Sequence, residues 1–240
     1  MSLFKKKKKH HETTTKEYGD RMITVSKSGS VNTEQFNTIR TNIEFSSADE
    51  QFKSIMLTSS MASEGKSTVA ANLAVSFARQ GKKTLLVDSD LRRPTLNATF
   101  SIADPKGLTN FLTEKDMPAN AAIYKTTVDN LSVMPSGPVP PNPSELLASP
   151  TVDQLFSALR EKYDYIIVDS APVGMVSDTF SLTRISDATV YVCRANYTNL
   201  KDIEYINSLY ADNRLKRMSL VVNGTETKKG YGYGYGQNKV

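Results

Sequence analysis

The stretch from Ser59 to Thr68 has the residue types of a loop that binds phosphate groups. An apolar run at 54–58 precedes it and predicts a buried strand, and Val69, Leu73 and Phe77 follow it at helical spacing. A strand, a loop and a helix in this order direct backbone N–H groups and the positive end of the helix at an anion. The alternative is a chance match in a serine-rich turn. The context favours a nucleotide phosphate site.

Individual positions in this loop predict individual contacts. Lys66 is expected to reach the β- and γ-phosphates of ATP, and the Ser67 hydroxyl is expected to hold Mg²⁺. The usual first glycine of the motif is replaced by Ser60. The residues predicted to contact the nucleotide are Ser60, Ala62, Ser63, Glu64, Gly65, Lys66, Ser67 and Thr68.

Two further apolar runs end in aspartates. The run at 84–87 is followed by Asp88 and Asp90, and the run at 165–168 by Asp169. A doubly wound sheet binds its ligands at the carboxyl ends of its strands, so these carboxylates are expected beside Lys66. Phosphoryl transfer uses such a set: a lysine and Mg²⁺ offset charge, and a carboxylate takes the proton of the attacking hydroxyl.

The predicted catalytic residues are therefore Lys66, Asp88, Asp90 and Asp169, and the predicted Mg²⁺ ligands are Ser67, Asp88 and Asp169. The alternative for each aspartate taken singly is a helix cap or a surface charge, but chance does not readily place all three directly after apolar strands. The sequence leaves open how the three carboxylates divide metal binding and base work.

The order of apolar runs and helical patterns predicts an α/β fold. Strands alternate with helices along the chain, which implies a mostly parallel sheet covered on both faces. Near the start, a helix is expected from Asn32 to about Ser47, with Glu34 and Arg40 off its apolar stripe. A helix is also expected from Asp178 to Ile185, and the pattern from Leu96 to Val128 is unclear.

Composition sets the limits of this interpretation. The chain has 240 residues, 39% hydrophobic and 23% charged, which suits one domain at 27–224 between polar tails at 1–26 and 225–240. No apolar run has the length of a bilayer span and no signal peptide is visible, and Cys193 is the single cysteine; together these favour the cytosol. The formal charge of +5 does not by itself indicate nucleic acid. The lysine run at 5–9 is either a solvated tail or a segment attracted to anionic lipid.

Several segments together resemble the bacterial tyrosine kinases of capsule and exopolysaccharide synthesis, a group of P-loop NTPases. Residues 85–92 resemble their second Walker A motif, and residues 166–172 resemble their Walker B motif. Residues 137–147 resemble their proline-rich loop, and residues 34–45 resemble the helix that joins neighbouring subunits. The resemblance covers about residue 30 to the C-terminus.

This resemblance implies a non-specific protein-tyrosine kinase that uses ATP and Mg²⁺. Tyr231, Tyr233 and Tyr235, separated by single glycines, resemble the family's autophosphorylated cluster. The alternating glycines predict a segment that does not fold, and its start just past the last strand favours modification by a neighbouring copy. The alternative for this tail is a sticky low-complexity segment.

The resemblance also implies partners. The kinase would be a separate chain, activated by the cytoplasmic tail of a membrane-embedded polysaccharide co-polymerase and therefore peripheral to the inner face of the plasma membrane. It would form a ring-type homo-oligomer through Glu34 and Arg40, unless those residues belong to a merely solvated helix face. A cognate tyrosine phosphatase is expected, and no nucleic acid.

Two departures from the family pattern bear on these expectations. Asn37 replaces an arginine of the joining helix, which predicts a weaker ring. Ser63 replaces a glycine of the phosphate-binding loop and lacks its freedom at positive φ, which bears on nucleotide affinity.

Two other classes of protein compete with this interpretation. One is a partition or cell-division ATPase acting as a nucleotide switch, but those proteins carry an early lysine in the loop, and none lies between Lys53 and Lys66. The other is a non-enzymatic nucleotide-dependent interaction protein, which the three aspartates disfavour.

Overall fold

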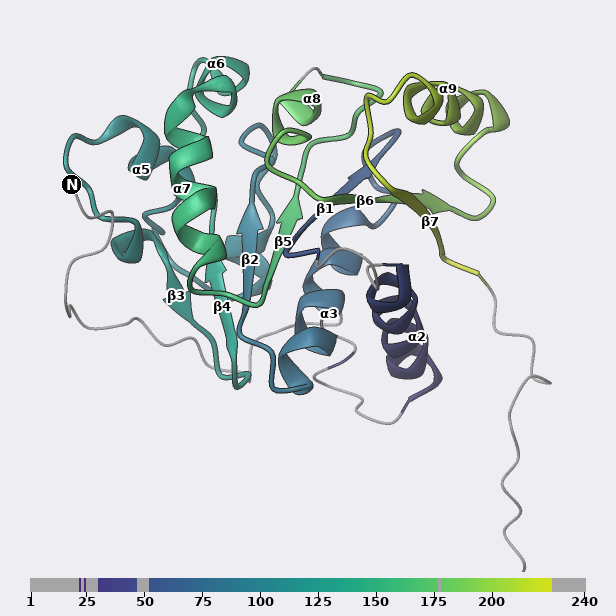
Figure 1. Cartoon of the computed structure of the whole chain (residues 1–240), viewed down its shortest axis with the longest axis horizontal. Helices are drawn as coiled ribbons and strands as arrows, with labels where there is room; N and C mark the ends of the chain where they lie inside the picture. Colours follow the sequence, from purple (N-terminus) through teal and green to yellow (C-terminus); the bar gives the residue numbers. More distant parts are fainter. Residues whose placement is uncertain (1–21, 23, 25–29, 47–51, 177, 226–240) are drawn as a thin grey trace, which may run out of the picture.

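The computed structural model describes residues 22, 24, 30–46, 52–176 and 178–225 (Figure 1). Its centre is a seven-stranded sheet with the order β3-β4-β2-β5-β1-β6-β7. All neighbouring strands are parallel except β3, which pairs with β4 in the antiparallel sense. The strands are β1 (Ser54–Ser59), β2 (Thr84–Asp88), β3 (Tyr124–Lys125), β4 (Leu131–Met134), β5 (Tyr165–Asp169), β6 (Ala188–Arg194) and β7 (Met218–Asn223).

Both faces of this sheet are buried, because successive side chains in the central strands enter two different hydrophobic clusters. Ile55 and Leu57 of β1 lie in one cluster, and Met56 between them lies in the other. The same alternation occurs in β2, where Leu86 lies in the first cluster and its two neighbours lie in the second. Strands that are apolar throughout, as the sequence showed, are those that carry helices on both sides.

The helices divide between the two faces. Residues of α2, α3 and α4 pack into the first cluster, and residues of α5 to α9 pack into the second. The helices are α2 (Val31–Ser46), α3 (Lys66–Arg79), α4 (Leu96–Thr99), α5 (Leu108–Thr113), α6 (Pro143–Ala148), α7 (Pro150–Arg160), α8 (Asp178–Leu182) and α9 (Leu200–Ala211), with a short 3₁₀ helix, η2 (Ala119–Ala122). Within the described residues, none of the helices is both long and apolar enough to cross a membrane.

The α/β fold predicted from the sequence is confirmed, with differences in two places. The unclear segment 96–128 contains α4, η2 and the two-residue strand β3. The helix expected to run from Asp178 to Ile185 ends at Leu182. The packed part of the chain also begins before residue 27: Met22 is buried, and the Thr24 backbone N–H and hydroxyl both donate to Asn72 Oδ1, at 2.9 Å each.

The prediction for Arg40 is wrong in its geometry. Arg40 follows Phe36 by four residues, so the helical repeat places it on the face of α2 that packs against α3, not on the solvent face. Its side chain is buried, and Nη1 donates to the Ser76 carbonyl and hydroxyl, both at 3.1 Å. Asn37 belongs to the same contact, because its Oδ1 accepts from the Ser76 hydroxyl at 2.9 Å. Glu34 is exposed, as predicted.

Candidate functional site

A cavity of about 380 Å³ lies at the carboxyl ends of β1, β2 and β5. Its walls are the loop between β1 and α3, the segment after β2 and the segment after β5. Most of the predicted site residues line it: Ala62, Ser63, Glu64, Gly65, Lys66, Ser67, Thr68 and Asp90. Ser60, Asp88 and Asp169 are buried next to these wall segments. Arg92 also lines the cavity.

The loop from Ser59 to Thr68, hereafter the phosphate loop, contains two residues in the left-handed region. Gly65 has φ 93°, and a Cβ there would lie 2.0 Å from Asn223 Nδ2, so only glycine fits. Ser63 has φ 67°, a conformation that costs a non-glycine residue about 1 kcal/mol. The loop therefore needs a positive φ at position 63, which glycine adopts freely and serine does not. The loop ends where Val69 N donates to the Gly65 carbonyl and α3 begins.

The replacement of the usual first glycine by Ser60 requires no left-handed backbone, because the φ of Ser60 lies outside that region. Its hydroxyl forms a hydrogen bond of 2.5 Å with the hydroxyl of Tyr191 on β6, and both residues are buried. Burial raises the pKa of Tyr191 to about 12, so the phenol keeps its proton and the contact is neutral. At this position a serine attaches the start of the phosphate loop to the neighbouring strand.

The predicted charged residues meet at the strand ends. Lys66 Nζ is 2.5 Å from Asp169 Oδ1 and 3.8 Å from Asp90 Oδ2. Asp88 and Asp169 are directly paired positions in the parallel register of β2 and β5. The expected convergence of one lysine with three carboxylates is therefore present.

The surroundings of Asp88 and Asp90 disfavour the charged form of both carboxyl groups. Burial, together with the nearby charge of Asp169, raises the pKa of Asp88 to about 7. Asp88 Oδ2 accepts from the backbone N–H groups of Thr95 and Leu96 at the start of α4, at 3.2 and 3.1 Å. Burial also raises the pKa of Asp90. Carboxyl groups with raised pKa values in a cleft are typical of functional sites.

The residues present fit a divalent cation. Asp169 Oδ2 is buried without a hydrogen-bond partner, a state that is rare for a buried oxygen and that a cation would satisfy. The Ser67 hydroxyl is close to the same place, 3.4 Å from Lys66 Nζ. In the part of the chain that is described, no group of three or more His, Cys, Asp or Glu residues has metal-binding geometry. One unpartnered carboxylate oxygen and a nearby hydroxyl suit Mg²⁺, which takes few protein ligands and completes its shell with phosphate oxygens and water.

Sequence reasoning missed the residues that hold Arg92. Its Nε donates to Asp178 Oδ2 at 2.7 Å, and its Nη2 donates to the Ser144 hydroxyl at 3.1 Å. Ser144 also forms a short hydrogen bond with Asp178. This cluster attaches the proline-rich segment and α8 to the wall of the cavity. Because its members lie 34 or more positions apart, no local pattern indicates it.

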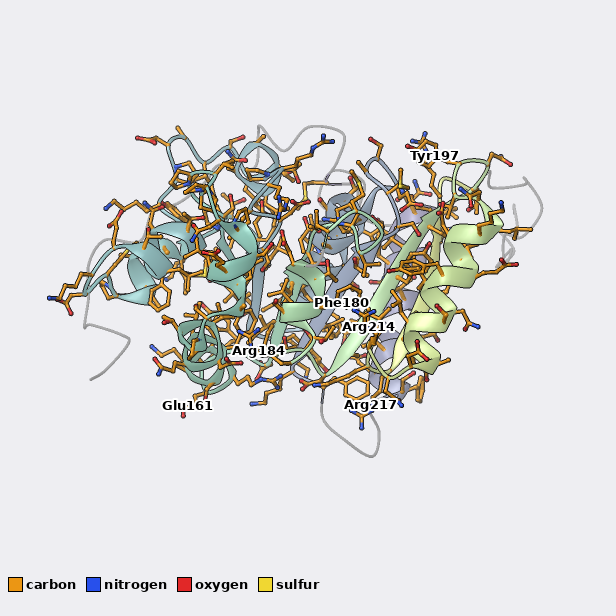
Figure 2. The ribbon with its side chains drawn as sticks, turned by 90° about the horizontal axis from the view of Figure 1, so that it is seen from above. Glu161, Phe180, Arg184, Tyr197, Arg214 and Arg217 are labelled. Atoms are coloured by element: carbon orange, nitrogen blue, oxygen red, sulfur yellow. The ribbon has the colours of Figure 1, made fainter. Side chains whose placement is uncertain are left out.

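Sequence reasoning also missed a second set of contacts, made to the phosphate loop by the last residue of β6 and the segment between β6 and α9. Arg194 Nη1 donates to the Ser63 carbonyl at 3.1 Å, and the Tyr197 hydroxyl donates to the Ala62 carbonyl at 3.3 Å. The Thr198 hydroxyl donates to the buried Glu64 carboxylate in a short hydrogen bond. Figure 2 shows Tyr197 near the start of α9, at the edge of the molecule.

The fold and the site together define a class of protein. A phosphate loop between the first strand and its helix, in a parallel sheet with aspartates at the ends of two neighbouring strands, is the architecture of a P-loop NTPase. Such a fold binds a nucleotide at this loop.

Comparison with known proteins identifies the family. Residues 52–213 match the family described as AAA domain. The chain is 41% identical over 218 residues to the tyrosine-protein kinase YwqD of Bacillus subtilis, covering 89% of this chain and 92% of that protein. It is 37% identical over 201 residues to the tyrosine-protein kinase CpsD of Streptococcus agalactiae serotype Ia, covering 83% and 85%. The crystal structure of the chimerical protein CapA2B2 superposes with a TM-score of 0.82 and 33% identity, covering 90% of this chain and 94% of that one.

The chain therefore belongs to the bacterial tyrosine-protein kinases, and it is a protein-tyrosine kinase. The resemblance drawn from its motifs is confirmed. This family assignment does not favour the two competing classes, a partition or cell-division ATPase and a non-enzymatic interaction protein.

Proposed function

We propose that this kinase transfers the γ-phosphoryl group of ATP to Tyr231, Tyr233 and Tyr235 of neighbouring copies, and that it thereby regulates capsule or exopolysaccharide synthesis and export. The observation that carries the proposal is the cluster of Lys66 with Asp90 and Asp169 beside the phosphate loop. A lysine and carboxylates that converge at this loop suit phosphoryl transfer.

The geometry supports a division of roles among these residues. The backbone N–H groups of the phosphate loop and Lys66 bind the phosphates, which draws Lys66 away from Asp169 toward the ligand. Ser67, Asp88 and Asp169 would hold Mg²⁺, which would offset negative charge on the bound nucleotide. Asp90 takes the proton of the attacking tyrosine hydroxyl, because it lines the cavity whereas Asp88 and Asp169 are fully buried.

The tail tyrosines lie outside the described residues, but the strand that leads to them is described. Asn223, at the end of β7, donates from Nδ2 to the Glu64 carbonyl at 3.0 Å, so the chain leaves the sheet beside its own phosphate loop. The seven residues from 225 to Tyr231 extend up to about 24 Å. This length is compatible with modification within one chain as well as between copies, and the proposal of transfer between copies rests on the family resemblance.

A mixing experiment tests transfer between copies. One chain carries Lys66→Met and keeps its tail, and the other is active but has phenylalanine at the three tail positions. We expect mass spectrometry to find phosphate on the tail of the Lys66→Met chain under activating conditions with ATP and Mg²⁺. Each chain incubated alone is the control, and neither should acquire tail phosphate. Phosphate on the wild-type tail but none in the mixture would show that each chain modifies itself.

The remaining proposals concern assembly and location. Activation by the cytoplasmic tail of a membrane-embedded co-polymerase would place the kinase at the inner face of the plasma membrane, with a tyrosine phosphatase reversing its action. The exposed Glu34 supports a subunit contact through α2, whereas Arg40 is engaged within its own chain. Three phosphates would add roughly −4.5 to −6 charge to each tail, and the resulting repulsion would loosen a ring.

A further inference from the structure

Three side chains at the end of β6 and just after it contact the turn of the phosphate loop. Arg194, Tyr197 and Thr198, hereafter the brace, contact three consecutive loop residues through the Ala62 carbonyl, the Ser63 carbonyl and the Glu64 carboxylate. These are the residues around the left-handed position, where Ser63 has φ 67°.

A strained backbone conformation persists only when its surroundings hold it in place. Serine at φ 67° relaxes to an extended or helical conformation unless other contacts oppose the change. A peptide rotation at Ser63 would turn the Ala62 and Ser63 carbonyls away from Tyr197 and Arg194. The brace therefore opposes the rotation that would release the strain. Such a rotation would also redirect the N–H groups that bind phosphate.

The members of the brace act together. The Arg194 guanidinium lies over the Tyr197 ring, 5.4 Å from its centroid, so each side chain fixes the direction of the other. The Glu64 carboxylate is buried and accepts from Met61 N at 2.8 Å as well as from the Thr198 hydroxyl. A buried carboxylate needs these donors, so Thr198 stabilises the turn from inside while Arg194 and Tyr197 hold its outer carbonyls.

We propose that Arg194, Tyr197 and Thr198 are positioning residues that keep the phosphate loop in its nucleotide-binding conformation, and that the loop depends on them because position 63 is serine. The proposal rests on the nucleotide site proposed above. Its distinctive consequence is a coupling: glycine at position 63 adopts the left-handed conformation without strain, so a loop with glycine needs the brace less.

The test compares Arg194→Met, Tyr197→Phe and Thr198→Val in the natural chain and in a Ser63→Gly chain. The dissociation constant of ADP in the presence of Mg²⁺ is measured by calorimetry, and the melting temperature of each ligand-free variant is recorded. We expect Arg194→Met and Thr198→Val each to weaken ADP binding about five- to tenfold with serine at position 63. With glycine there, we expect less than a twofold effect. Tyr197→Phe should follow the same pattern with a smaller change.

The matched control is Tyr205→Phe, which removes the hydroxyl of an exposed tyrosine on α9 and should not alter ADP binding in either chain. Equal weakening in both chains would overturn the inference, because it would mean that the brace contacts the ligand or supports the fold in general. Unchanged ADP binding in both chains would also overturn it. Absence of ADP binding by the natural chain would overturn the proposed nucleotide site itself, and this inference with it.

Discussion

Aspartates lie beside cationic side chains at both ends of the sheet, fully buried at Asp88 and Asp169 and only half-buried at Asp187, and the electrostatics of the two ends are opposite. At the carboxyl end, burial raises the pKa values of Asp88 and Asp90, and Asp169 keeps an oxygen without a hydrogen-bond partner. At the amino end, burial raises the pKa of Asp187, but hydrogen bonds from Arg160 and the backbone outweigh it and hold this pKa below its usual value. Arg160 Nη1 lies 2.7 Å from Asp187 Oδ2.

The difference separates a functional charge cluster from a structural one. Asp187 receives both backbone N–H groups at the start of β1, from Lys53 at 2.8 Å and Ser54 at 2.9 Å, so its negative charge is satisfied within the protein. At the carboxyl end, Asp169 Oδ2 has no hydrogen-bond partner, and a ligand of the site would supply one. Charge at the amino end stabilises the fold, whereas charge at the carboxyl end is retained at the expense of stability.

The largest expected effect concerns the two lysines at these ends. Lys66→Met should reduce tyrosine phosphorylation more than about 100-fold, because it removes the cation that offsets charge on the transferred group. The far-ultraviolet circular dichroism spectrum should remain that of an α/β protein. Lys53→Met is the matched control: Lys53 Nζ donates to the Arg160 carbonyl at the opposite end, and its loss should leave phosphorylation near the natural level. Wild-type activity in Lys66→Met would remove Lys66 from the catalytic set.

The second effect concerns Asp187. Asp187→Ala should lower the free energy of unfolding by about 2 to 3 kcal/mol at pH 7, because it leaves charged and backbone donors without their acceptor. Since the folded pKa is depressed, this stabilisation is present above the unfolded pKa and is lost as pH falls through the folded pKa. Chemical denaturation at pH 7 and near pH 4 should therefore show a smaller difference between variant and natural chain at the lower pH. A difference that grew on acidification would contradict this role.

The smallest effect concerns Asp90 and has the opposite sign. Asp90→Asn should raise the free energy of unfolding by about 0.5 to 1 kcal/mol at pH 8 while it impairs phosphorylation, because a neutral amide is less costly to bury. The folded pKa of Asp90 is raised, so its destabilising effect appears as pH rises above the unfolded pKa. Denaturation without Mg²⁺ at pH 5 and pH 8 measures this, and the gain should be larger at pH 8. A loss of stability at both pH values would show that Asp90 is a structural charge.

The sequence predicted the parts of the site that local patterns encode. The phosphate loop and the aspartates follow apolar runs directly, and parallel strands bring such positions to one edge of the sheet, so Lys66, Asp90 and Asp169 were found. The two-residue strand β3 was not predicted, because two residues show no periodicity. Arg40 was predicted on the solvent face of α2 because it is charged. Its spacing indicates the packed face, because position 40 follows Phe36 by one helical turn.

Other features depend on contacts between distant residues. Thr198 and Glu64 are separated by 134 positions, and Arg160 and Asp187 by 27, and neither separation has a characteristic pattern. The left-handed conformation at Ser63 was indicated by the glycine that the family usually has there. The side chains that hold that conformation could be identified only once β6 was placed beside β1.

The strand order also governs when the nucleotide site can form during protein synthesis. The strands that flank β1 are β5 and β6, which end at Asp169 and Arg194, far later in the chain. At a translation rate of roughly 5 to 20 residues per second, the ribosome needs on the order of ten seconds to proceed from the phosphate loop to the end of β6. Until β5 has been made β1 has neither neighbouring strand, and until β6 has been made it has only one, so one edge of β1 stays unpaired through this interval. Nucleotide binding is therefore a property that the chain acquires only after β6 has been made.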